Sequence, residues 1–290
     1  MKTKVCAKVN LALDVKSLLD NGYHELDMIM APVSVFDELE VNALPQSASP
    51  SEDVIECLNE ELPENNTLKK TMDLLRQNYK IRHFYKIILN KGIPSQAGLG
   101  GASADAAALI KAVNRLEGLN LSMDQMQKIG AQVGADVPYC LLSGYARVQG
   151  FGEKTEPIFS DWKIPVLLVQ PEDGISTPEC FKTWDEQEKK IHYDVDIVED
   201  ALIKKDPALL FSTMANALED PAFEQLPVLR EIKEEMNDEG IVRVMMTGSG
   251  SVMMGFSVDE DVLDEACRKL KKRYPFVCRA VIGPADESES

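Results

Sequence analysis

The stretch that decides the fold is Pro94-Ser95-Gln96-Ala97-Gly98-Leu99-Gly100-Gly101-Ala102-Ser103-Ala104-Asp105, which runs without a break into the alanine-rich segment 106–113. Three glycines within four positions, followed by a serine where a helix begins, expose backbone N–H groups at the positive end of a helix dipole. Such groups bind phosphate. A flexible turn between a strand and a helix is the plainer interpretation of a glycine loop. Here the flanking proline, the Ser and Asp at the helix start and the small-residue helix favour phosphate binding.

The letters of this loop exclude several known motifs. No Gly-Lys-Ser/Thr follows it, so it is not a P-loop, and Ser103 in the sixth position excludes a dinucleotide fingerprint. The motifs of the protein kinases are absent from the sequence. A hydrolase elbow, Gly-x-Ser-x-Gly, fails at its last glycine. The order Ser103, an acid and then His192 nevertheless leaves a hydrolase as a rival.

The amino-acid composition limits the classes of function that this chain can have. The 290 residues carry 31 Lys and Arg against 48 Asp and Glu, a net charge of −17, which argues against nucleic acid as the main partner. The apolar runs are too short to span a membrane, and the N-terminus does not resemble a signal peptide, so we expect no membrane partner and a cytoplasmic protein. The six cysteines form no C-x-x-C pair, and the three histidines form no metal-ligand cluster. We therefore expect reduced thiols and no dedicated transition-metal site.

The order of elements predicts two α+β domains, 1–159 and 160–290, that meet at an acidic, proline-punctuated stretch near Ser160. In the second domain the pattern favours a mainly antiparallel sheet with helices on one face. The predicted strands are 4–13, 81–89, 164–169, 242–246, 252–256 and 276–282, and the predicted helices begin at the Asn66 cap, at the glycine loop, at the Ser122/Gln125 capping box, near 223 and near 259.

Three further segments carry polar or small residues. Lys8 and Asn10 point the same way from the N-terminal strand, which makes them either a solvated edge or part of a site. Asp136, in a helix-ending turn, either caps that turn or accepts a proton from a substrate hydroxyl while Lys8 keeps it ionised. The run Thr247-Gly248-Ser249-Gly250-Ser251, between two apolar strands, forms either a hairpin or a close backbone approach to a ligand.

Taken in order and at their spacing, these segments resemble the three motifs of the GHMP kinase superfamily, named for galactokinase, homoserine kinase, mevalonate kinase and phosphomevalonate kinase. The resemblance covers nearly the whole chain and implies a two-domain α+β fold, with a ribosomal-protein-S5-domain-2-like N-terminal domain and a ferredoxin-like C-terminal domain. The segments Asn21–Leu26 and Gly134–Pro138 are similar to one branch of that family. That branch phosphorylates the 2-hydroxyl of a diphosphocytidyl alcohol in the methylerythritol phosphate route to isoprenoids, with ATP and Mg²⁺ as cofactors.

The resemblance also implies roles for single residues. Asp136 would be the catalytic base and Lys8 its charge-neutralising partner. Tyr23 would stack on cytosine, with Phe181 on the other side of the base and His24 and Asn10 as hydrogen-bonding groups. The remaining assignments are Asn66 and Lys91 beside adenine, Gly248, Ser249 and Gly250 as the third glycine motif, Ser103 as the candidate metal ligand, and Pro94, Ser95, Gln96, Ala97, Gly98, Leu99, Gly100, Gly101, Ala102, Ser103 and Ala104 around the ATP phosphates.

Two loop positions depart from the family pattern, because Ala102 and Ala104 stand where glycine and a second serine are usual. Ser103 is left as the hydroxyl of the loop. The departures keep two alternatives open, a GHMP kinase of another small alcohol and a non-catalytic relative that only binds nucleotide. We expect a monomer or a weak homodimer.

Overall fold

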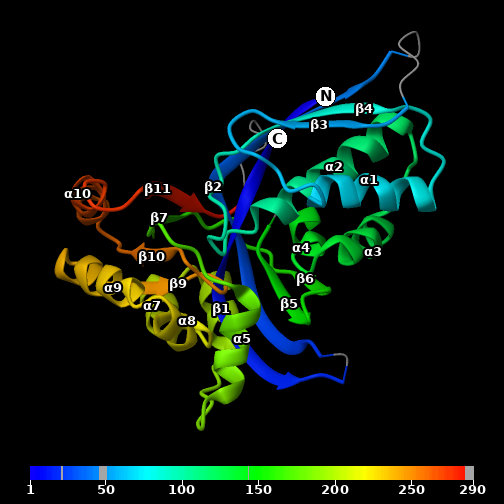
Figure 1. Ribbon diagram of the computed structural model, residues 1–290. Coiled ribbons are helices and arrows are strands. Elements are labelled where there is room, and N and C mark those ends of the chain that lie inside the picture. The colour runs from blue at the N-terminus through cyan, green and yellow to red at the C-terminus, as the bar shows by residue number, and fades with distance from the viewer. Residues whose placement is uncertain (21, 46–50, 143, 285–290) are drawn as a thin grey trace.

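The computed structural model describes residues 1–20, 22–45, 51–142 and 144–284, so Asn21 of the predicted turn lies outside the described residues. Within these ranges eleven strands join in one sheet, and helices cover it (Figure 1). The elements in chain order are β1 (Lys2–Leu18), β2 (His24–Ala43), β3 (Val54–Cys57), α1 (Thr67–Asn78), β4 (Tyr85–Asn90), α2 (Gly101–Glu117), α3 (Met123–Val133), α4 (Val137–Leu142), β5 (Ala146–Gly150), β6 (Lys154–Pro157), β7 (Ile164–Gln170), α5 (Thr177–Glu186), α6 (Val195–Lys204), α7 (Pro207–Thr213), β8 (Ala215–Asn216), α8 (Glu219–Gln225), α9 (Val228–Asp238), β9 (Arg243–Met246), β10 (Met253–Phe256), α10 (Glu260–Leu270) and β11 (Phe276–Ile282).

The long antiparallel pair β1 and β2 runs through the middle of the molecule and is longer than the predicted strand 4–13 (Figure 1). Its register shifts between Asn10 and Ala12, which changes the face to which later side chains point. Val9 and Leu11 therefore lie in one hydrophobic cluster and Leu13 in another. The predicted strand 81–89 begins later, at Tyr85, because Glu117 of α2 holds the preceding segment by its hydrogen bond from His83 N.

The helices α1 to α4 pack against β2 and β4 in a shared apolar cluster. Their predicted ends are confirmed. Asn66 accepts a hydrogen bond from Lys69 N at the start of α1, and Ser122 and Gln125 form the capping box of α3. Gly118 ends α2 in the left-handed conformation that glycine favours. The glycine loop therefore leads into a firmly packed helix.

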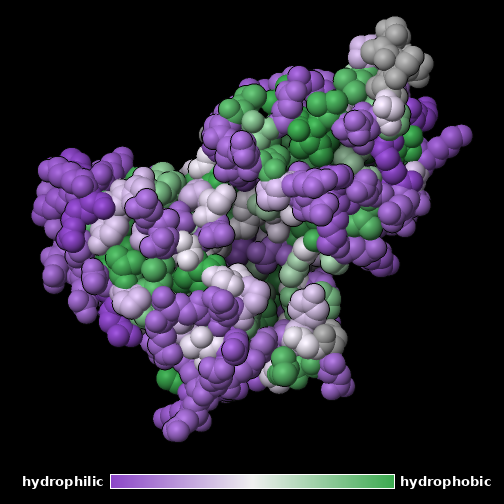
Figure 2. Space-filling model, in the orientation of Figure 1, coloured by the Kyte–Doolittle hydropathy of each residue, from purple (hydrophilic) through white to green (hydrophobic). Residues whose placement is uncertain are grey.

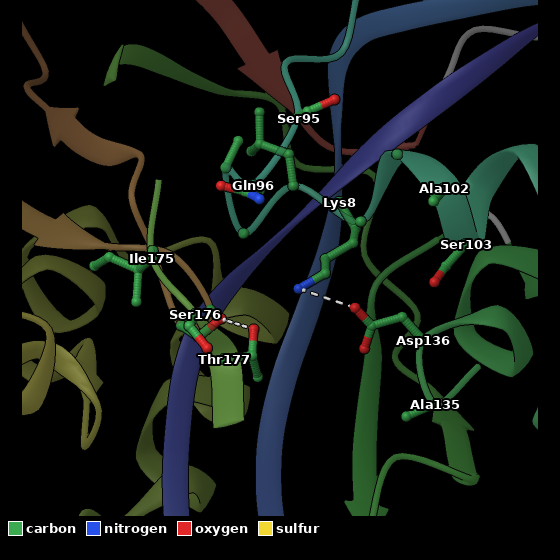
Figure 3. Close-up of a pocket in the computed structure, with 18 of the residues that line it drawn as sticks. Lys8, Ser95, Gln96, Ala102, Ser103, Ala135, Asp136, Ile175, Ser176 and Thr177 are labelled. Atoms are coloured by element: carbon green, nitrogen blue, oxygen red, sulfur yellow. Dashed lines mark hydrogen bonds and ion pairs between the residues drawn. The ribbon is translucent and has the colours of Figure 1, made fainter. Parts of the chain in front are cut away.

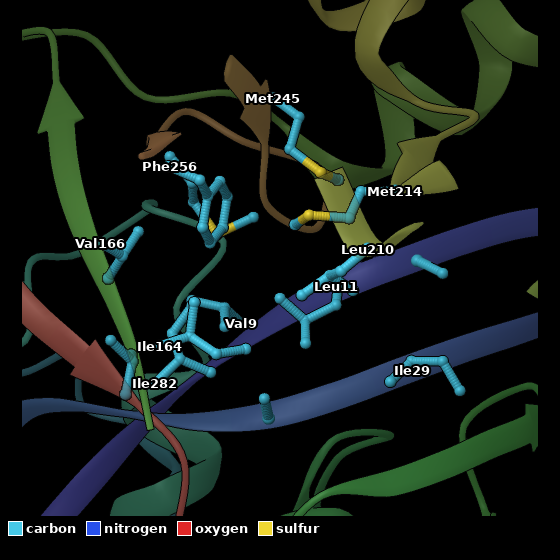
Figure 4. Packing of buried hydrophobic residues seen from close by; sticks show 14 of the residues in the cluster. Val9, Leu11, Ile29, Ile164, Val166, Leu210, Met214, Met245, Phe256 and Ile282 are labelled. Carbon is cyan, nitrogen blue, oxygen red and sulfur yellow. The ribbon is translucent and has the colours of Figure 1, made fainter. Parts of the chain in front are cut away.

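Strands β11, β7, β10 and β9 form the predicted antiparallel sheet. Alternate residues of β7 point to opposite faces. Leu167 joins the apolar residues of α9 and α10, whereas Val166 joins those of α6 and α7 in the cluster that also holds Phe256 (Figure 4). The rings of Phe256 and Phe211 of α7 lie 5.7 Å apart. Helices thus cover both faces, and the expectation of helices on one face is wrong because the charged region after β7 folds back between this sheet and β1.

The two halves of the chain share the sheet through two short pairings, Ile282 of β11 opposite Val33 of β2 and β8 alongside Ala12 and Leu13 of β1. A division into domains at residue 160 stays a prediction. None of the described helices combines the length and the apolar character that crossing a bilayer requires. The described residues include all six cysteines, and no disulfide forms among them.

Candidate active site

A cavity of about 1330 Å³ opens between the part of the molecule that carries α1 and the part that carries α5, where the surface is visibly hollowed (Figure 2). Of the residues predicted for the site, all but one line this cavity. The exception is Ala104, which is buried in α2. Segments that are far apart in the sequence therefore meet at one place.

The glycine loop needs its glycines for backbone geometry. Gly98 and Gly100 have φ values of +72° and +68°, and Gly100 is the residue at which α2 begins. A Cβ at Gly98 would lie 2.3 Å from the carbonyl oxygen of Thr247, and a Cβ at Gly100 would lie 2.9 Å from Cγ of Lys8. The loop can therefore press against two neighbouring segments while the first turn of α2 opens into the cavity.

The third glycine motif supports this loop from behind. Ser251 N donates to Gln96 O and Val252 N donates to Ala97 O, each at 3.2 Å. The hydroxyl of Thr247 accepts a hydrogen bond from Asn10 N at 2.9 Å. A hairpin alone does not describe the motif, because backbone hydrogen bonds join it to the glycine loop and the Thr247 hydroxyl joins it to β1.

Sequence reasoning missed the residue that holds this motif in place. Asn216 of β8 is buried and donates its amide to Met246 O at 2.9 Å and to Gly248 O at 2.8 Å. A single asparagine before a helix carries no signal for such a role. Only the pairing of β8 with β1 brings it to the site.

Lys8 and Asp136 form the ion pair of the site, with Lys8 Nζ 3.4 Å from Asp136 Oδ2 (Figure 3). Lys8 Nζ also donates to Asn10 Oδ1 at 2.9 Å. The solvated-edge interpretation of Lys8 and Asn10 is wrong, since both residues are buried. Asp136 keeps 29% of its side chain exposed, so a carboxylate oxygen remains accessible beside a fixed cation.

The hydrolase rival is not supported by the geometry. His192 bonds with Asp14 through Nδ1 at 3.3 Å, and it is not among the described residues that line the cavity with Ser103. Without a histidine beside it, Ser103 lacks the general base that a serine nucleophile needs.

A set of aromatic side chains, here called the aromatic group, lines the end of the cavity away from the glycine loop and consists of Tyr23, His24, Phe151 and Phe181. The ring of His24 stacks on Phe181 at 4.6 Å and 17°, and Tyr23 lies 5.5 Å from Phe151. Sequence reasoning missed Asp185, whose Oδ1 lies 2.9 Å from His24 Nε2 and so fixes the orientation of the ring. The predicted residues Tyr23, His24 and Phe181 thus lie at the same end of the cavity. In the structure, the ring that stacks on Phe181 is that of His24.

The two residues predicted beside adenine both have partners in the protein. Asn66 uses its side chain to cap α1. Lys91 pairs with Asp37 and with Asp105, and sequence reasoning predicted neither contact. Burial raises the pKa of Asp105 to about 7, although Lys91 acts in the opposite direction.

The fold and the site define a class of protein, an ATP-dependent small-molecule kinase. Residues 66–144 match the model of the GHMP kinases N terminal domain, and residues 198–275 match that of the GHMP kinases C terminal. The chain shares its fold with the crystal structure of an L. major mevalonate kinase in complex with R-mevalonate, which aligns with a TM-score of 0.73 at 19% identity, over 98% of this chain and 96% of that one.

More similar proteins narrow the family. A 4-diphosphocytidyl-2-C-methyl-D-erythritol kinase of Lachnospira eligens is 35% identical over 94% of each chain, and one of Clostridium kluyveri is 35% identical over 97% of this chain and all (100%) of its own. A crystal structure of 4-(cytidine 5'-diphospho)-2C-methyl-D-erythritol kinase aligns with a TM-score of 0.80 at 28% identity, covering 98% of this chain and 100% of that one. The chain belongs to the family of the 4-diphosphocytidyl-2-C-methyl-D-erythritol kinases.

Proposed function

We propose that this protein transfers the γ-phosphate of ATP to the 2-hydroxyl of 4-diphosphocytidyl-2-C-methyl-D-erythritol, a step of the methylerythritol phosphate route to isoprenoids. The observation that carries the proposal is the Lys8–Asp136 pair, which lies in one cavity with the glycine loop and the aromatic group. The names of the relatives support the choice of this alcohol over others.

In the proposed mechanism Asp136 accepts the proton of the substrate hydroxyl. The hydroxyl oxygen bonds to the γ-phosphorus, the bond from that phosphorus to ADP breaks, and ADP leaves with the electron pair. Lys8 keeps Asp136 ionised before transfer and offsets negative charge on the moving phosphoryl group. This chemistry needs position and charge rather than a covalent nucleophile.

ATP binding is assigned to the glycine loop and the first turn of α2. Their backbone N–H groups and the helix dipole attract phosphate without adding side-chain charge. This explains how a chain with a net charge of −17 binds a polyanionic nucleotide. Asn66 and Lys91 border the part of the cavity assigned to adenine.

The residues present fit a magnesium ion held mainly by the ATP phosphates. Such an ion takes one or two protein oxygen ligands and keeps several waters. Ser103 and Asp136 both line the cavity and supply oxygens of that kind. We assign Ser103, with Asp136, as the residues that would hold Mg²⁺, which neutralises phosphate charge when bound.

The cytosine ring is assigned to the aromatic group. Tyr23, which is 60% exposed, presents an aromatic ring on which a base can stack, and Phe181 borders the same end of the cavity. His24 and Asn10 are the hydrogen-bonding groups within reach of the cavity. An aromatic ring and an imidazole suit a flat base that both donates and accepts.

An ADP-release assay with a panel of alcohols tests the proposal. We expect release to depend on 4-diphosphocytidyl-2-C-methyl-D-erythritol and to stay at background with mevalonate, homoserine or galactose. Turnover of one of the other alcohols would contradict the substrate assignment. ATP binding without release for any alcohol would point to a non-catalytic relative. A cytoplasmic location, an independence from nucleic acid and a monomer or weak homodimer stay predictions.

A further inference from the structure

Three charged side chains lie buried at the start of α2, just outside the groups that the proposed reaction uses. Lys91 Nζ pairs with the carboxylate of Asp37 and lies 3.0 Å from Asp105 Oδ2. Their side chains are 9%, 0% and 3% exposed, respectively. An ammonium held in this way by two carboxylates is not free to move into the cavity.

Each carboxylate belongs to a different part of the framework. Asp37 lies on β2, where its Oδ1 also accepts Gly92 N at 2.7 Å and Ile93 N at 2.8 Å. The backbone fits closely there, because a Cβ at Gly92 would lie 2.4 Å from Phe36 O. Segment 91–93 is thus fixed to β2 immediately before the glycine loop begins.

The other carboxylate lies at the opposite end of the same loop. Asp105 follows Ala104 in the first turns of α2. Its carboxylate accepts a hydrogen bond from the ammonium of Lys91, which lies three positions before Pro94. The ammonium also lies directly beneath the helix start, since a Cβ at Gly101 would lie 3.0 Å from Lys91 Nζ. One side chain therefore spans from the entry of the loop to its exit.

We propose that Lys91 is a positioning residue that joins the two ends of the glycine loop through Asp37 and Asp105, and that it acts on ATP through the shape of that loop. The inference rests on the proposed role of the loop in ATP binding. It differs from a direct contact of the Lys91 ammonium with the nucleotide, because a contact of that kind would not depend on Asp105.

A double-mutant cycle separates these two roles. The dissociation constant of a non-hydrolysable ATP analogue is measured by calorimetry on the full chain for Lys91→Met, Asp105→Ala and the double variant. If Lys91 acts through Asp105, each single variant weakens binding by about tenfold and the double variant is no weaker than Lys91→Met, to within about twofold. Independent effects that multiply to about a hundredfold would overturn the proposal.

Conservative variants supply the matched controls. Lys91→Arg and Asp105→Asn keep a donor and an acceptor, and we expect both to bind the analogue within about threefold of the wild type. The loss in Lys91→Met should fall on the KM for ATP, with kcat changed by less than about threefold. If Lys91→Met does not fold, the comparison of Asp105→Ala with Asp105→Asn decides, and equal wild-type affinity in both would overturn the proposal.

The Gly98→Ala variant distinguishes a failure of this inference from a failure of the proposed role of the loop in ATP binding. The added Cβ would meet the carbonyl oxygen of Thr247 in the third glycine motif. Wild-type affinity for the analogue in Gly98→Ala would show that the loop is not the ATP site, and the proposed function would fail with the inference. Weak binding in Gly98→Ala, together with wild-type binding in Lys91→Met and Asp105→Ala, would overturn the inference alone.

Discussion

Tyr23 is the residue at which substrate binding and ATP binding separate most clearly, because it lies at the aromatic end of the cavity, away from the glycine loop. We expect Tyr23→Ala to raise the KM for the diphosphocytidyl alcohol by about tenfold, since a stacked base loses its platform. The KM for ATP should stay within about twofold. Steady-state kinetics with each substrate varied in turn measures both values.

Tyr23→Phe is the control for that variant, because it keeps the ring and removes the hydroxyl. Its KM for the alcohol should stay close to that of the wild type. A rise in the KM for ATP with no change for the alcohol would place the cytosine elsewhere. The stacking of His24 on Phe181 would then remain a purely structural contact.

The glycine loop leads to a prediction about one element, the helix α2. Gly118 at the other end of this helix provides the control. Gly98 and Gly118 have similar φ values of +72° and +65°, but only Gly98 faces a backbone oxygen, whereas nothing lies within 4 Å of a Cβ at Gly118. Both alanine variants carry the left-handed strain of about 1 kcal/mol. Only Gly98→Ala must also displace Thr247.

We therefore expect Gly98→Ala to lower the free energy of unfolding by about 1–3 kcal/mol and to weaken ATP binding. Gly118→Ala should lose only the shared strain and bind ATP normally. Urea unfolding and calorimetry on both variants measure the difference. Equal stability and equal ATP affinity would show that the loop does not press against the third glycine motif.

The other end of α2 makes a prediction about pH. Burial alone would raise the pKa of Glu117, but hydrogen bonds from Tyr85, His83 and Arg82 outweigh it and lower the pKa to about 2. Because the pKa in the folded protein lies below the ordinary glutamate value of 4.5, the carboxylate stabilises the fold above about pH 4.5. That contribution is lost as the pH falls towards 2.

Glu117→Gln should therefore lower the free energy of unfolding at pH 7 by about 1–3 kcal/mol. The gap between the variant and the wild type should narrow as the pH falls from about 5 to about 2. Unfolding curves at several pH values measure this gap. A gap of constant size would mean that the charge of Glu117 does not stabilise the end of α2.

At the scale of the whole molecule, local signals in the sequence predicted most of the helices and strands. Caps such as Asn66 and Ser122, and the glycines that end or begin helices, act within one turn and can be identified from neighbouring letters. Short apolar runs likewise identified the strands around Gly248. The position of α6 and α7 on the second face of the sheet was not predictable in this way, because it depends on contacts with β1.

The same division holds for the site. Motifs with distinctive letters identified the loop, Lys8 and Asp136, and the structure brings them into one cavity. Sequence reasoning missed Asp37 and Asn216 and did not predict the contact of Asp105 with Lys91, because these roles arise only from contacts between different elements of the fold. The burial of Lys8 was left open for the same reason.

The most direct test of the account is the turnover number of Asp136→Asn with ATP and 4-diphosphocytidyl-2-C-methyl-D-erythritol, with ATP affinity measured on the same preparation. The amide keeps the size of the side chain but cannot accept the hydroxyl proton. The account predicts a fall in kcat of about 10²- to 10⁴-fold with ATP affinity nearly unchanged. Turnover close to that of the wild type would contradict it.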